Sequence, residues 1–156
     1  MASKLEIIDK IVIRTQEPAI RIISKVGKLA NAADRDHCIQ YMVAVGLIFG
    51  DLIAEYYEDD FHQENQLIDK LRDKMIIEED NQFSMDYLDP EKRSIANAVQ
   101  VFFNDGTCSD DIQIEYPIGH KKRREEGIPL LEEKFWNNLN TCFDKDKSKL
   151  IYDLCL

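Results

Sequence analysis

Alternating apolar and polar residues near the start of the chain predict a β-strand at residues 5–15, LEIIDKIVIRT. In an extended chain Ile11 and Ile13 point to one face, while Lys10 and Arg14 point to the other. β-Branched residues in this period-two pattern are typical of strands. The alternation therefore indicates a sheet with one apolar and one polar face.

Two further alternating runs predict a β-hairpin in residues 94–117, SIANAVQVFFNDGTCSDDIQIEYP. Asn104, Asp105 and Gly106 separate the runs, and these residue types tolerate the left-handed backbone that tight hairpin turns require. A short apolar run at residues 75–80, MIIEED, predicts another strand. Four strands are therefore expected in all.

Apolar residues that recur every three or four positions predict helices between the first two strands. A helix at residues 17–27 would begin at Pro18 and end at Gly27. The next segment, residues 31–52, could begin with Asp34 as its N-cap. Because its apolar residues occur nearly all round the helix, we expect it to be the buried core helix.

Four more helical segments are predicted at residues 52–60, 64–75, 128–143 and 146–156. Pro129 suits the first turn of the third of these. The residues expected on its buried face are Leu130, Leu131, Phe135, Leu139 and Phe143. The apolar residues of the last segment are Leu150, Ile151, Leu154 and Leu156. Since no Gly, Asn or basic residue ends it, we expect that this helix is cut short.

The resulting order of elements, β-α-α-α-α-β-β-β-α-α, predicts the α+β class. We expect a small antiparallel sheet covered by helices, forming a single domain over residues 1–156. A chain of this length is sufficient to bury one hydrophobic core.

The net charge of -10, from 20 Lys and Arg against 30 Asp and Glu, argues against nucleic-acid and anionic-membrane partners. Both kinds of partner depend on a positive field around the protein. The longest apolar run, residues 42–49, is too short to cross a bilayer, and no apolar signal segment opens the chain. A cytoplasmic location is therefore expected. The four cysteines form no CxxC pair, so we expect reduced, mostly structural thiols and neither a zinc site nor a disulfide framework.

Within this acidic chain, five basic residues form an uninterrupted run at residues 120–124, HKKRR, just after Gly119. The run lies between a predicted strand and a predicted helix, where loops commonly hold ligands, and its cations could neutralise carboxylates or a phosphate. Alternatively, the run balances nearby acidic residues as a solvated surface. The acidic residues concerned are Glu125, Glu126, Glu132 and Glu133.

The other two histidines have simple structural interpretations. His37, at the expected start of the core helix, could face an anion there, but from the residues alone we favour a capping or hydrogen-bonded structural role. His62 lies in YEDDFHQEN, whose carboxylates could be considered hard-metal ligands. Helical spacing would scatter these side chains over different faces, so we expect His62 to be solvated and no metal to bind.

Longer blocks of sequence resemble a known family. These blocks are RDHCIQYMVAVGLIFGDL, YEDD, DPEKRSIANAVQVFFNDGT and EYPIGHKKRREEGIPLLEEKF. They are similar, in this order, to the C-terminal part of proteins of the MmgE/PrpD family, from about Ile11 to the end of the chain. The resemblance implies a C-terminal lid domain, with the large helical N-terminal domain of the family absent from this chain.

The resemblance also implies an activity. The parent proteins are hydro-lyases that remove water from 2-methylcitrate to give 2-methyl-cis-aconitate in propionate breakdown, without an iron–sulfur cluster or other cofactor. The implied partners are a tricarboxylate substrate, the N-terminal helical domain and a second subunit in a homodimer. The implied location is the cytoplasm, or the mitochondrial matrix in a eukaryote.

Six residues in the matching blocks are implied as contacts to the carboxylate substrate: Arg35, His37, Tyr41, His120, Lys121 and Arg123. Elimination of water needs a base, an acid and cations that stabilise enolate-like charge. The acid and base are expected in the absent helical domain, so this chain alone is expected to be inactive. A free-standing truncated paralogue that binds or regulates, or a remnant without function, are the alternatives.

Overall fold

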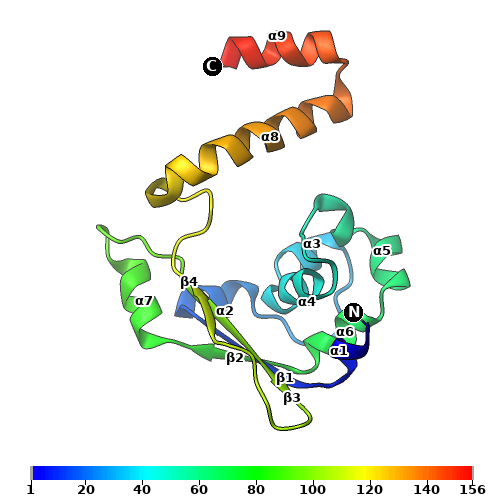
Figure 1. Cartoon of the computed structure of the whole chain (residues 1–156), viewed down its shortest axis with the longest axis vertical. Coiled ribbons are helices and arrows are strands. Elements are labelled where there is room, and N and C mark those ends of the chain that lie inside the picture. The colour runs from blue at the N-terminus through cyan, green and yellow to red at the C-terminus, as the bar shows by residue number, and fades with distance from the viewer. Residues whose placement is uncertain (1, 156) are drawn as a thin grey trace. The chain divides into compact units, whose positions relative to one another are not determined.

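A computed structural model describes residues 2–155, which separate between Glu115 and Tyr116 into two compact units. We call the N-terminal part unit 1 and the C-terminal part unit 2. The helices of unit 1 are α1 (Ala2–Glu6), α2 (Glu17–Ile23), α3 (Ala32–Asp36), α4 (Ile39–Phe49), η1 (Ala54–Tyr57), α5 (Asp59–Glu64), α6 (Leu67–Arg72) and α7 (Asn81–Leu88) (Figure 1). Unit 2 contains η2 (Lys121–Arg123), α8 (Arg124–Cys142) and α9 (Lys145–Cys155). That the whole chain acts as one domain stays a prediction.

The strands of unit 1 are β1 (Ile8–Thr15), β2 (Met75–Glu79), β3 (Asn97–Phe103) and β4 (Ile112–Ile114), in the order β2-β1-β3-β4. β1, β3 and β4 pair antiparallel, whereas β2 runs parallel to β1. The α+β class is therefore confirmed, but the sheet is mixed rather than wholly antiparallel. The reason is that the chain crosses over through α2 to α6 between β1 and β2, and such a crossover connects parallel strands.

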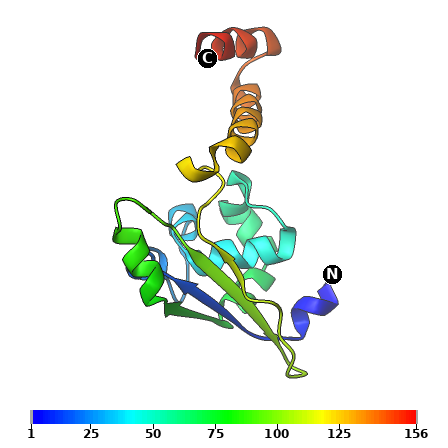
Figure 2. The same cartoon turned by 60° about the vertical axis from the view of Figure 1, so that its left-hand side comes forward.

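The predicted hairpin is confirmed as β3 and β4, and its connecting loop extends beyond the paired strands (Figure 2). Gly106 in this loop has a φ of 83°, the left-handed backbone that was expected of it. Asp105 accepts hydrogen bonds from both the backbone and the side chain of Thr107. These bonds hold the pKa of the Asp105 carboxyl below its ordinary value.

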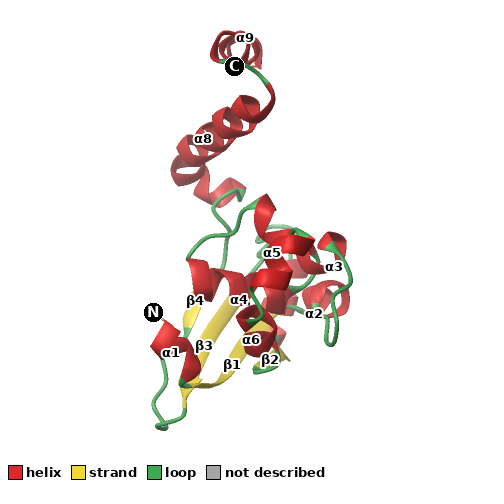
Figure 3. Cartoon of the chain, turned by 90° about the vertical axis from the view of Figure 1, so that its right-hand side faces the viewer, coloured by secondary structure: helices red, strands yellow, loops and turns green. Residues whose placement is uncertain are grey.

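The core of unit 1 lies between one face of the sheet and the helices α4 and α6, which Figure 3 shows across the strands. Its sheet residues include Ile11 and Ile13, as the alternation predicted, and Val101 opposite Ile11. A smaller cluster joins Phe83 of α7 to Ala96 and Ala98. Since Ala98 and Val101 are three positions apart on one strand, they point to opposite faces of the sheet. α7 therefore covers part of the other face.

Several helix predictions were wrong in extent. Residues 5–7 precede the strand, and α2 ends at Ile23 rather than at Gly27. The predicted core helix at 31–52 is two helices, since the chain leaves helical geometry at His37 and Cys38. Asn31, not Asp34, is the N-cap of the first, because its side chain accepts the Asp34 N–H.

The predicted burial of helices was also wrong in places. α4 is buried along one side only, and Phe49 and Gly46 are exposed. α7 was not predicted at all. In unit 2, Leu139 is buried as expected, Phe135 is partly buried, and Leu130, Leu131 and Phe143 are exposed. The last helix is confirmed as α9, and Leu156 lies outside the described residues.

Candidate functional site

Arg35 on α3 is a buried cation with defined partners. Only 1% of the residue is exposed. Its Nε donates to the carbonyl oxygen of Tyr57 over 2.7 Å, and its Nη2 forms an ion pair with Asp59. Burial of a guanidinium is tolerated when a carboxylate and hydrogen-bond acceptors surround it. Arg35 thus ties α3 to the end of η1 and the start of α5.

A polar pocket of about 490 Å³ opens beside this ion pair, entirely within unit 1. Its lining residues are Lys28, Leu29, Ala30, Arg35, Asp59, His62, Gln63, Gln66 and Asp69. His62 on α5 is only 13% exposed at its side chain, and its Nε2 lies 3.0 Å from Asp69 Oδ2. The prediction that His62 is solvated was therefore wrong. No spacing rule for a single helix could have found this contact, because His62 lies on α5 and Asp69 on α6.

Tyr41 on α4 lies behind this pocket in the core, fully buried. Its hydroxyl donates to the Tyr56 carbonyl oxygen over 2.7 Å, and its ring packs edge-on against His62 with centroids 5.6 Å apart. Burial raises the pKa of Tyr41 to about 12. Arg35 and Tyr41 therefore bind the successive carbonyls of Tyr57 and Tyr56, and together they hold η1 in place.

His37 takes a different position from the one expected. It is the C-cap of α3 rather than the first turn of α4, and its side chain is exposed. Its Nδ1 contacts the carboxylate of its neighbour Asp36. His37 does not line the polar pocket, whereas Arg35 and His62 do.

The basic run in unit 2 is a folded turn. His120 is the N-cap of η2, since its Nδ1 accepts the Lys122 backbone N–H over 3.2 Å. Its ring stacks on Tyr116 with centroids 4.6 Å apart. Lys122 lies over the same Tyr116 ring and donates to its hydroxyl over 2.8 Å. The turn is therefore ordered by Tyr116.

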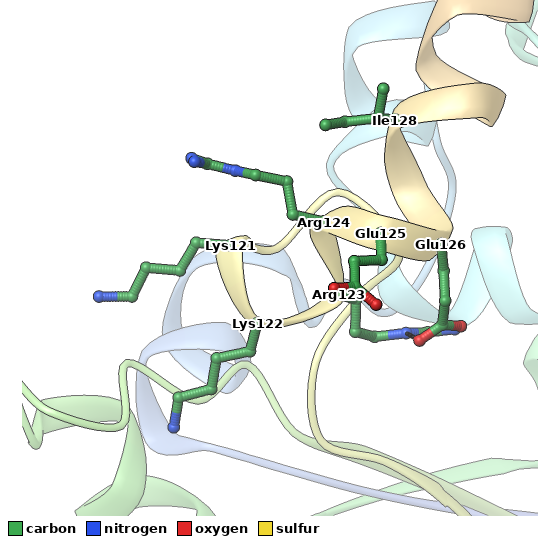
Figure 4. Close-up of a pocket in the computed structure, with 7 residues that line it drawn as sticks. All are labelled: Lys121, Lys122, Arg123, Arg124, Glu125, Glu126 and Ile128. Atoms are coloured by element: carbon green, nitrogen blue, oxygen red, sulfur yellow. Dashed lines mark hydrogen bonds and ion pairs between the residues drawn. The ribbon is translucent and has the colours of Figure 1, made fainter.

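Arg123 is engaged within the turn. Its Nη2 lies 2.8 Å from Glu126 Oε2, and its Nη1 donates to the Tyr116 carbonyl oxygen over 3.0 Å. The Arg123 guanidinium holds the pKa of the Glu126 carboxyl below its ordinary value. By contrast, Lys121 and Arg124 form no ion pair with any residue in the range 2–155. Figure 4 shows both of these side chains extending away from Arg123 and Glu126.

A close backbone approach fixes the start of α8 beside this turn. The buried Gly127 lies so near Ile118 that a Cβ on it would be 2.3 Å from the Ile118 carbonyl oxygen. The residues Lys121 to Glu126 and Ile128 line a pocket of about 470 Å³ (Figure 4). The alternative interpretation of the run as charge balance holds for Arg123, which pairs with Glu126, and leaves Lys121 and Arg124 unexplained.

Comparison with known proteins confirms the family resemblance over the whole length of this chain. Residues 1–156 match the MmgE/PrpD C-terminal domain. The chain belongs to the MmgE/PrpD family. It is 52% identical over 149 residues to the 2-methylcitrate dehydratase of Salmonella typhimurium, which covers 96% of this chain and 31% of that protein.

Other relatives of this MmgE/PrpD chain agree. It is 54% identical over 143 residues to the probable 2-methylcitrate dehydratase of Saccharomyces cerevisiae, covering 92% of this chain and 28% of that protein. It is 42% identical over 151 residues to an alkylcitrate dehydratase of a fungal strain, covering 96% and 30%. The chain thus spans less than a third of the length of these relatives and corresponds to the C-terminal domain of the family.

The structure distributes the six expected contact residues of this MmgE/PrpD domain over four places. Arg35 lines the pocket of unit 1, Tyr41 lies in the core beside it, and His37 is exposed elsewhere on unit 1. His120, Lys121 and Arg123 share the turn of unit 2. Their roles as substrate contacts stay predictions.

The described part of the chain has neither a membrane-spanning helix nor a metal-binding cluster. In residues 2–155, no helix is both long and apolar enough to cross a membrane. No group of three or more His, Cys, Asp or Glu side chains is arranged to hold a metal ion within the same residues. Of the four cysteines, which are unbridged, only Cys38 is buried.

Proposed function

We propose that this chain forms the C-terminal domain of a dehydratase that converts 2-methylcitrate to 2-methyl-cis-aconitate without an iron–sulfur cluster or other cofactor. The observation that carries the proposal is the identity of 52% to the Salmonella typhimurium 2-methylcitrate dehydratase across 96% of this chain. The proposed complete protein adds an N-terminal helical domain and forms a homodimer.

The proposed reaction breaks one C–H bond and one C–O bond and forms one C=C bond. A base takes the proton α to a carboxylate, and an acid protonates the departing hydroxyl, which leaves as water. The negative charge that builds up on the carboxylate side of the substrate is stabilised by nearby cations. We assign the base and acid to the helical domain and assign cations to this chain.

Of the three expected contact residues in the basic run, Lys121 best suits a substrate carboxylate. It is exposed, borders the pocket of unit 2 and forms no ion pair within the described residues. Arg123 is already neutralised by Glu126, and His120 uses Nδ1 to cap η2. We therefore propose that His120 and Arg123 shape the turn that presents Lys121.

The test is a chimera in which this chain replaces the matching part of the Salmonella typhimurium dehydratase. Turnover is followed by the ultraviolet absorbance of the conjugated C=C bond in the product. We expect the chimera to dehydrate 2-methylcitrate and this chain alone to be inactive. A folded chimera without activity would overturn the proposal, and turnover by this chain alone would contradict the division of roles.

In the active chimera, Lys121→Glu tests the substrate contact. We expect a fall in kcat/KM of about tenfold to a hundredfold, because a repulsive charge replaces an attractive one. The matched control is Lys134→Glu, which should leave kcat/KM unchanged. Lys134 is an exposed lysine of α8 that forms no ion pair within residues 2–155. Equal effects of the two changes would assign Lys121 to general surface charge.

The alternative function is a binding or regulatory module that pairs with a complete enzyme. It is favoured by one observation, that unit 1 closes its own core around Ile11, Tyr41 and Leu71. Adding this chain to the intact Salmonella typhimurium enzyme distinguishes the two functions. A concentration-dependent change in the activity of that enzyme would support the module.

The proposed location is the cytoplasm, or the mitochondrial matrix if the source is a eukaryote. The support is that one relative, 51% identical over 144 residues, is named a mitochondrial 2-methylcitrate dehydratase in Yarrowia lipolytica. Fractionation of source cells tests this location.

A further inference from the structure

We propose that the polar pocket of unit 1 binds a small polycarboxylate, one carboxylate of which takes the place that Asp59 holds on Arg35. The pocket is formed by unit 1 alone, so this binding needs neither unit 2 nor a second protein. The proposal rests on the proposed function only for the identity of the anion, a tricarboxylate related to the substrate.

The first argument is that the buried charge of Arg35 must be compensated by an anion. A guanidinium that is 1% exposed keeps its charge, so loss of its carboxylate without replacement leaves an uncompensated buried charge. The Tyr57 carbonyl satisfies Nε but supplies no negative charge. Any state of unit 1 in which Asp59 departs is therefore stable only when another anion arrives.

The second argument is the unequal burial of the two partners. The Asp59 side chain is 63% exposed, whereas that of Arg35 is 2% exposed. Asp59 is the first residue of α5, and rotation about its side-chain bonds carries the carboxylate into solvent at no cost in packing. Asp59 can thus be exchanged, while Arg35 stays in place.

The third argument is the charge that the pocket would show an incoming anion. Lys28 is exposed at its edge and forms no ion pair within residues 2–155. Asp69, the other carboxylate of the lining, is already bound by Arg72 over 2.5 Å and by His62 over 3.0 Å. When Asp59 departs, the charged side chains that still line the pocket are Lys28, Arg35 and Asp69, a net charge of +1.

The remaining lining suits a ligand with several carboxylates. Gln63, Gln66 and His62 also border the pocket, and His62 Nε2 is engaged by Asp69. A polycarboxylate could bind Arg35 with one group and Lys28 with another, because both cations border the same volume of about 490 Å³. A monocarboxylate would replace Asp59 without the second contact and should bind more weakly.

The experiment is a titration of the full chain with citrate, with acetate as the monocarboxylate. Binding is followed by the imidazole NMR signals of the three histidines at fixed pH and ionic strength. We expect citrate to shift the signal of His62 in the pocket and to leave those of His37 and His120 unshifted. Acetate should produce the same shift only at much higher concentration.

Asp59→Asn tests the exchange itself. If Asp59 occupies Arg35 for roughly nine-tenths of the time, its removal should tighten citrate binding about tenfold. The adjacent Asp60→Asn is the matched control, since Asp60 is also exposed and does not line the pocket, and its replacement removes the same charge. Equal affinities of the two variants would overturn the role of Asp59.

Lys28→Glu covers the case in which Asp59→Asn does not fold. Lys28 is exposed, so its replacement should leave the fold intact and weaken citrate binding at least tenfold. The control is Lys70→Glu, which makes the same change of charge and should leave the affinity for citrate unchanged. Lys70 is an exposed lysine of α6 outside the pocket. Equal weakening by both variants would indicate general surface electrostatics and would overturn the pocket as the site.

Failure of this proposal can be told apart from failure of the proposed function. If citrate does not shift the His62 signal while the chimera dehydrates 2-methylcitrate, the pocket is a structural ion pair and the dehydratase assignment stands. If citrate binds at Arg35 and the chimera is inactive, the pocket stands and the dehydratase assignment fails.

Discussion

The two units use the same kind of apolar periodicity with very different results. In unit 1, α4 and α6 bury Tyr41, Val45 and Leu71 against the sheet. In unit 2, α8 and α9 contact each other through the stacked rings of Trp136 and Tyr152, 4.5 Å apart. Five large apolar side chains of α8 and α9 nevertheless stay exposed, namely Ile128, Leu130, Leu131, Leu150 and Leu154, the last at 78%.

The difference shows what an amphipathic pattern does and does not determine. The pattern identifies which face of a helix is apolar, but a sheet or several helices are needed to cover that face. Unit 1 supplies a sheet, whereas two helices alone have too few neighbours. Exposed apolar area of this kind is typical of surfaces that contact something else. Stability should therefore depend strongly on the size of the buried apolar side chains of unit 1 and hardly at all on that of the exposed apolar side chains of unit 2.

The largest expected effect is that of Leu71→Ala. Leu71 is 1% exposed in the core of unit 1, so its truncation leaves a cavity and should lower the free energy of unfolding by about 2–5 kcal/mol. Leu131→Ala in α8, where the side chain is 49% exposed, should cost about 0.5 kcal/mol or less. Urea unfolding followed by circular dichroism measures both. Similar losses for the two changes would contradict the comparison.

The substitution of Gly by Ala should change stability in opposite directions in the two units. Gly127→Ala should destabilise unit 2 by about 1–3 kcal/mol, because the new Cβ would lie 2.3 Å from the Ile118 carbonyl oxygen. Gly46→Ala in α4 meets nothing within 4 Å and should stabilise unit 1 by about 0.5–1 kcal/mol through helix propensity.

The single tryptophan of the chain, Trp136, lies in α8 and makes the glycine test specific to each unit. Gly127→Ala should shift the unfolding midpoint seen by Trp136 fluorescence. Gly46→Ala should leave that midpoint unchanged and slow the hydrogen exchange of β1 amides. A stabilising Gly127→Ala would show that the Ile118 backbone moves away easily.

Much of unit 1 could be predicted from sequence because its signals are local. The alternation of Ile11 and Ile13, the turn at residues 104–106 and the short run at β2 each identify a strand. The parallel pairing of β2 with β1 could not be predicted locally, since it depends on the path of all the intervening helices. The break between α3 and α4 has no Gly or Pro to indicate it locally. It accompanies the burial of Cys38, which depends on tertiary packing.

The candidate site followed the same rule. Arg35, His120 and Lys121 were identified from blocks of sequence, without their contacts. The ion pair of Arg35 with Asp59 and the position of His62 against Asp69 join different helices, so no spacing rule for a single helix indicates them. For the basic run, sequence found the charges, but only the structure separates Arg123, which is paired, from Lys121.

The smallest expected effect concerns the surface ion pair of Arg123 with Glu126. Because Arg123 holds the pKa of Glu126 below its ordinary value of 4.5, the pair stabilises unit 2 above that pH. This stability is lost as the pH falls through the depressed pKa, where the carboxyl is protonated in both the folded and unfolded states.

Glu126→Gln should therefore lower the thermal midpoint reported by Trp136 slightly at pH 7 and not at all at pH 2. Glu133→Gln, an exposed residue of α8 that forms no ion pair within residues 2–155, is the control and should show no such dependence. A deficit for Glu126→Gln that is the same at both pH values would indicate a packing role rather than a charge. Since Glu126 adjoins Gly127, that outcome would indicate that backbone contacts order this turn, whereas packed side chains stabilise the core of unit 1.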